Sequence, residues 1–110
     1  MITDRDRQSL VDIINSITLA GEYLQHKSQA DFEQDPILQD AIIRRIEIVG
    51  EAAARLSETA RNEMQAVSWK QIIGMRNIMI HQYDRVDLQL VWDTVTQAFP
   101  RLIQSLQPYL

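Results

Sequence analysis

The sequence contains no cysteine, and it has only three glycines and three prolines among 110 residues. Without cysteine the chain cannot form disulfides, thiolate-bound zinc sites, iron–sulfur clusters or a thiol nucleophile. The scarcity of glycine and proline argues against many short strands joined by tight turns. The composition therefore favours a few long helices.

Histidine, long apolar runs and positive charge are also scarce. The two histidines, His26 and His81, are too few for a histidine-rich metal site within one chain. No apolar run approaches the ~20 residues that span a bilayer, and the start of the chain is polar rather than signal-like. We expect a soluble, cytoplasmic protein with no membrane partner. Its net charge of −4 gives no general attraction to nucleic acid, so any contact with RNA would need a local basic patch.

The length and the apolar pattern predict one domain over residues 1–110, folded as an all-α, up-and-down bundle of four main helices. Each predicted helix follows a residue suited to capping its first turn. Thr3 precedes a helix predicted over residues 4–26, and Asp35 precedes one over 36–56. Ser68 precedes a helix predicted over 69–81, and Asp87 precedes one over 88–106. Short helices are expected within 27–34 and 57–67. Pro100 should kink or split the last helix.

The predicted helix 69–81 departs from a simple amphipathic pattern. It is apolar nearly all round, which is typical of a buried helix, yet it carries Arg76, Asn77 and His81. Arg76 occupies a position where an ordinary amphipathic helix would have leucine. A charge removed from water costs several kcal/mol unless it is paired, so such a break in the pattern suggests function.

Two interpretations of these polar residues remain open. In a purely structural one, Arg76 pairs with Glu47 or Glu51, and His81 caps the end of its own helix. In the functional one, Arg76, Asn77 and His81 line a polar cleft. Asn77 and His81 share a helix face, whereas Arg76 and His81 lie ~140° apart around the axis. The latter two can meet on one ligand if the helix ends near His81 or if a symmetry mate contributes.

Residues 76–83 read Arg-Asn-Ile-Met-Ile-His-Gln-Tyr, which fits the pattern Arg-x-x-x-x-His-x-Tyr. This motif resembles the signature of the HepT-like toxins of the HEPN superfamily. The flanking segments 46–53, 69–75 and 86–92 are also similar to that family. The likeness covers about residues 5–105 and implies a HEPN-like helical bundle.

The resemblance implies a metal-independent endoribonuclease that needs no cofactor. Such a protein is the toxin of a type VII-like toxin–antitoxin module, and it forms a homodimer whose two motifs face one cleft. Its partner is a nucleotidyltransferase antitoxin, which silences the nuclease by transferring AMP to the motif tyrosine, here Tyr83. The catalytic residues carried over by the motif are Arg76, Asn77 and His81.

The chemistry of these residues is compatible with cleavage of RNA. RNA supplies its own nucleophile, the 2′-hydroxyl, so the protein needs to move protons and stabilise charge. His81 can exchange a proton near neutral pH, because an ordinary histidine pKa is ~6.5. Arg76 can hold a phosphate bidentately, and Asn77 can orient either group. Each motif has one histidine, and a two-fold dimer would supply the second acid–base group.

Alternatives from other classes remain. The cleft could bind a nucleotide or a nucleotidyltransferase without cleaving anything, or the chain could be a structural dimerisation bundle. Tyr83 could be a packed core residue that no enzyme reaches. Candidates for a basic patch are Arg85 and the helix residues Arg44, Arg45 and Arg55, although surface arginines are more often simply solvated.

Overall fold

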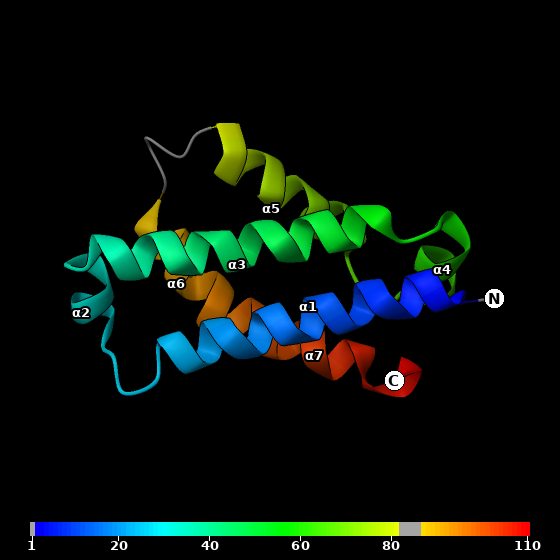
Figure 1. Cartoon of the computed structure of the whole chain (residues 1–110), viewed down its shortest axis with the longest axis horizontal. Coiled ribbons are helices and arrows are strands. Elements are labelled where there is room, and N and C mark those ends of the chain that lie inside the picture. The colour runs from blue at the N-terminus through cyan, green and yellow to red at the C-terminus, as the bar shows by residue number, and fades with distance from the viewer. Residues whose placement is uncertain (1, 82–86) are drawn as a thin grey trace.

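The computed structural model describes the backbone of residues 2–81 and 87–110, and the side chains of 2–76 and 87–110. The regular secondary structure of this part of the chain is all helical, with no strand, which confirms the predicted all-α class (Figure 1). The elements are α1 (Asp4–Tyr23), α2 (Gln29–Glu33), α3 (Pro36–Arg55), α4 (Glu58–Glu63), α5 (Trp69–His81), α6 (Leu88–Asp93), the π-helix η2 (Thr94–Ala98), α7 (Phe99–Leu106) and the 3-10 helix η3 (Gln107–Tyr109).

Helix α3 lies at the centre of the bundle and packs against α1 on one side and α5 on the other. In Figure 1 the helices α1 and α3 run antiparallel, α6, η2 and α7 lie behind them, and α5 lies at the upper edge. The core positions of α3 are at most 1% exposed: Ile42, Ile46, Val49, Ala52 and Ala53. Helix α5 packs chiefly on α3, and its side chains from Ile72 to Arg76 are only partly buried.

The predicted helix starts are confirmed by the caps. The Thr3 hydroxyl accepts from the Asp6 backbone N–H, and the Asp6 carboxylate accepts from the Thr3 N–H in return. Asp35 accepts from the Leu38 N–H at the start of α3. Asp87 caps α6 by accepting from the N–H of Gln89 and Leu90. Side-chain acceptors satisfy amide groups that a helix start leaves without partners.

The prediction for the end of the first helix is wrong. Helix α1 ends at Tyr23, and His26 lies in the following turn with a φ of 63°. Ile13 and Ala20 of α1 are fully buried, whereas Gly21 near its end is exposed. Helix ends lack the strong side-chain signals of helix starts, so the apolar pattern overestimated the length.

Pro100 splits the last main helix, as predicted. It lies in the first turn of α7, and the chain adopts the π form in the five residues before α7. Proline has no N–H to donate and its ring clashes with the preceding turn of a regular helix. The wider π turn accommodates this: the Phe99 N–H bonds to the Thr94 carbonyl, five residues back.

Candidate functional site

Arg76 packs directly against the backbone of α3 at Gly50. A Cβ placed on Gly50 would lie 3.3 Å from the Cα of Arg76, and closer still to its Cβ. No side chain of α3 separates the two helices at this point. The missing side chain of Gly50 therefore makes room for the start of the Arg76 side chain.

The Nε atom of Arg76 is buried and has no hydrogen-bond partner, although the residue as a whole is only partly buried. The Nε atom of Arg45 is likewise buried without a hydrogen-bond partner. Leaving a buried donor unpaired costs about 1–3 kcal/mol. A residue retained at such a cost is a candidate for function rather than for packing alone.

The structural interpretation of Arg76 as a partner of Glu47 or Glu51 finds no support. Both carboxylates face Arg44, whose Nη1 lies 3.4 Å from Glu47 Oε2 and 3.5 Å from Glu51 Oε1. Within the described part of the chain, neither carboxylate forms an ion pair with Arg76. The guanidinium of Arg76 is therefore not neutralised by α3.

The remaining motif residues are placed only in part. Asn77 and His81 lie on α5 with Arg76, and His81 is the last residue of that helix. The side chains of Asn77 and His81 lie outside the described residues, and so does the whole of Tyr83. The backbone thus brings Arg76 and His81 to the last turns of one helix, which is one of the two conditions for their meeting on a ligand.

Two of the three candidates for a basic patch on α3 are ion-paired. Arg44 pairs with Glu47 and Glu51, as described above. Arg55 Nη2 lies 2.9 Å from Asp12 Oδ2 on α1, so its charge is balanced as well. Arg45 forms no ion pair among the described residues, and its Nε is buried without a partner. Arg85, the fourth candidate, lies outside the described residues.

Neither tryptophan is an exposed stacking platform, because Trp69 is buried and Trp92 is partly buried against the core. Trp69 is 6% exposed, and its Nε1–H donates to the Met64 carbonyl at 3.1 Å. Trp92 packs on the core, with its ring centroid 5.9 Å from that of Phe32. Trp69 anchors the start of α5 and so fixes the helix that carries the motif.

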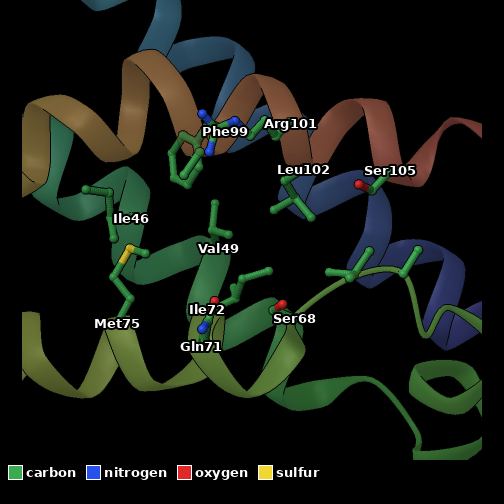
Figure 2. A pocket seen from close by; sticks show the side chains of 13 residues that line it. Ile46, Val49, Ser68, Gln71, Ile72, Met75, Phe99, Arg101, Leu102 and Ser105 are labelled. Carbon is green, nitrogen blue, oxygen red and sulfur yellow. The ribbon is translucent and has the colours of Figure 1, made fainter.

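A pocket of about 300 Å³, which the sequence did not predict, lies beside α5. It opens between α5 and the η2–α7 segment, over α3 (Figure 2). Its walls are apolar and its rim is polar. The apolar residues labelled in Figure 2 are Ile46, Val49, Ile72, Met75, Phe99 and Leu102, and the polar ones are Ser68, Gln71, Arg101 and Ser105. The only sequence signal for it was the excess of apolar residues around helix 69–81.

Among the side chains that the structure describes, no three His, Asp or Glu groups lie close enough together to share a metal ion. No helix, over the described ranges, is both long and apolar enough to cross a membrane.

The fold and the motif helix together define a class: an α-helical bundle whose motif helix carries arginine and histidine five residues apart. The model of the family described as "Ribonuclease HepT-like" matches residues 13–108. The chain therefore belongs to the HepT-like ribonuclease family, and the predicted resemblance is confirmed. Membership of this family indicates ribonuclease activity.

Curated relatives agree with this assignment. A "Putative RNase" of Caldanaerobacter subterraneus subsp. tengcongensis is 34% identical over 94% of this chain and 93% of its own length. A "Probable ribonuclease HepT" of Thermococcus cleftensis is 33% identical over 84% of each chain. A "Gamma-glutamylcyclotransferase and putative RNase" of Methanocaldococcus jannaschii is 42% identical, and this chain spans 42% of its length. No solved structure gives a significant match.

Proposed function

We propose that the chain is a metal-independent endoribonuclease and the toxin of a toxin–antitoxin module, acting as a homodimer with RNA bound between its two motifs. The observation that carries the proposal is Arg76. It begins the family motif on α5, it packs against α3, and no described carboxylate neutralises it. An unneutralised guanidinium on a firmly packed helix is suited to hold a phosphate.

In the proposed reaction, His81 of one copy takes the proton of the RNA 2′-hydroxyl. The 2′-oxygen attacks the adjacent phosphorus, and the bond between phosphorus and the 5′-oxygen breaks. The protonated His81 of the other copy donates its proton to the departing 5′-oxygen. The products are a 2′,3′-cyclic phosphate and a free 5′-hydroxyl, and the two histidines exchange protonation states.

Arg76 and Asn77 serve the same step. The guanidinium of Arg76 binds the non-bridging phosphate oxygens and stabilises the negative charge that builds on them as the 2′-oxygen attacks. Asn77, next along α5, orients the phosphate or the imidazole through its amide. Neither role requires a metal ion or a cofactor.

Apolar surface outside the core supports the homodimer. Helices α1 and α3 leave about half of their apolar residues exposed or only partly buried, among them Val11 at 45% and Ile37 at 83%. Helix α5 adds to this surface, because its sequence is apolar nearly all round and it packs chiefly on α3. A second copy against α5 would cover this helix and bring a second His81 to the cleft.

The second candidate is a helical module that binds a nucleotide or a nucleotidyltransferase without cleaving RNA. The net charge of −4 and the ion-paired arginines of α3 favour it. Incubation of the purified protein with RNA in EDTA separates the two functions, with a 2′-O-methylated copy of the same RNA as control. We expect cyclic-phosphate products from RNA alone. Binding of both the RNA and its 2′-O-methylated copy, with neither of them cleaved, would support the module instead.

A further inference from the structure

We infer that Gly50 on α3 is a positioning residue for Arg76, and this inference rests on the proposed nuclease function. Gly50 sets how closely α5 approaches α3 where the motif begins. A Cβ at Gly50 would meet the Cβ, Cγ and Cα of Arg76, the last at 3.3 Å. These atoms belong to or adjoin the backbone of α5, so the helix itself would have to move.

The other two glycines have room for a side chain, so the lack of space for a Cβ is particular to Gly50. Gly21 on α1 and Gly74 on α5 would each place a Cβ in open space, with nothing within 4 Å. Glycine within a helix costs about 0.5–1 kcal/mol relative to alanine. Gly50 is buried in the middle of α3, where the close packing of Arg76 gives a physical reason for this cost.

The packing restrains Arg76 at two points along its side chain. Its Cβ lies against the bare backbone of Gly50, and its Nε is shielded from solvent further out. An arginine restrained along its stem loses little further freedom when its guanidinium binds a phosphate. An outward shift of α5 would displace that guanidinium from the reacting phosphate, and a misplacement of ~1 Å can cost ~10²-fold in rate.

The test compares Gly50→Ala with Gly21→Ala, which adds the same methyl group to α1 in open space. We expect Gly50→Ala to lower kcat ~10- to 100-fold while KM changes less than ~3-fold, because Arg76 stabilises the transition state. Gly21→Ala should stay within ~2-fold of the wild type in both. Val91→Ala, a truncation in the α6 core, controls for lost stability. Equal kcat losses in Gly50→Ala and Val91→Ala would overturn the inference.

A double-mutant cycle with Arg76→Lys tests whether Gly50 acts through Arg76. Lysine keeps the charge but loses the planar fork that binds phosphate bidentately. In the Arg76→Lys background, Gly50→Ala should lower kcat by less than ~3-fold more, because residues that act as a unit are not additive. A full, independent loss in that background would show that Gly50 acts elsewhere.

Hydrogen exchange at Arg76 Nε, measured by NMR, tests the inference without any catalysis. In the wild type this proton should exchange slowly compared with that of the exposed Arg101, and Gly50→Ala should accelerate it where Gly21→Ala does not. If the wild type never cleaves RNA, the proposed function fails while this measurement still decides the role of Gly50. An Arg76 proton in the wild type that exchanges as fast as that of Arg101 would overturn the inference even if Gly50→Ala does not fold.

Discussion

Arg76 lies against a bare stretch of α3 backbone and has no carboxylate partner among the described residues. A purely structural arginine would gain most from a buried ion pair, since an unpaired charge in a partly buried site is costly. Glu47 and Glu51, the two partners that the sequence suggested, pair with Arg44 instead. Among the described residues no carboxylate pairs with Arg76, and a phosphate clamp requires a guanidinium without such a partner.

Tyr83 leads to a prediction about how the nuclease is regulated. We propose, from what the family resemblance implies, that its hydroxyl accepts AMP from ATP, with pyrophosphate as the leaving group. The attached phosphate would compete with RNA for Arg76, and the adenosine would obstruct the cleft. After incubation with the cognate nucleotidyltransferase and ATP, intact mass spectrometry should show AMP added to the wild type and none added to Tyr83→Phe. Equal labelling of both proteins, or labelling that leaves RNA cleavage unchanged, would contradict this role.

At the scale of elements, Asp6 joins the starts of two helices. Its carboxylate is 2% exposed and accepts from the Thr3 N–H and hydroxyl, and from the Ser57 N–H and hydroxyl at 2.8 and 2.9 Å. The Ser57 N–H is the largest cause that lowers the pKa of Asp6 to about 2, and burial opposes it. Asp6 thereby ties the first turn of α1 to the first turn of α4.

This tie predicts a pH dependence of stability. The folded pKa of Asp6 lies below its ordinary value of 3.8, so its stabilising contribution is complete above about pH 4 and is lost as the pH falls toward 2. Asp6→Ala should lower the free energy of unfolding at pH 7 by about 1–3 kcal/mol and flatten the acid dependence. Urea denaturation measures both. Asp40→Ala, at an exposed site on α3, should change stability by no more than about 0.5 kcal/mol. Equal losses in the two variants would contradict the role of Asp6.

Helix starts could be predicted from the sequence because their signals are local. Thr3, Asp35 and Asp87 cap the helices that they were expected to cap, and Pro100 splits the helix that it was expected to split. The contact between Asp6 and Ser57 spans 51 residues, and no local pattern predicts it. The same holds for Gly50 against Arg76 and for the pocket beside α5, because both depend on how α3, α5 and α7 cross. The spacing along the sequence was enough to find the motif residues. The residues that pack against them could be identified only from the folded structure.

At the scale of the whole molecule, the central proposal requires two copies. One chain supplies a single motif histidine, and α5 packs chiefly on α3 within its own chain. We expect multi-angle light scattering to give twice the mass of the chain at micromolar concentration, for the wild type and for Arg76→Ala alike. The alanine variant serves as control because the proposed role of Arg76 is to bind phosphate rather than to hold the copies together. A wild-type monomer would contradict the two-histidine cleft.

The central claim is that Arg76 and His81 together cleave RNA, and the most direct test is the cleavage rate of purified variants in EDTA. Removing a proton-transfer group or a phosphate clamp typically costs ~10²–10⁴-fold in rate. Arg76→Ala and His81→Ala should each lose cleavage to that extent while circular dichroism shows the helical content of the wild type. Gln71→Ala, at an exposed position on the same helix, should cleave at the wild-type rate. Full cleavage by either motif variant would contradict the account, and so would loss of helical structure in both.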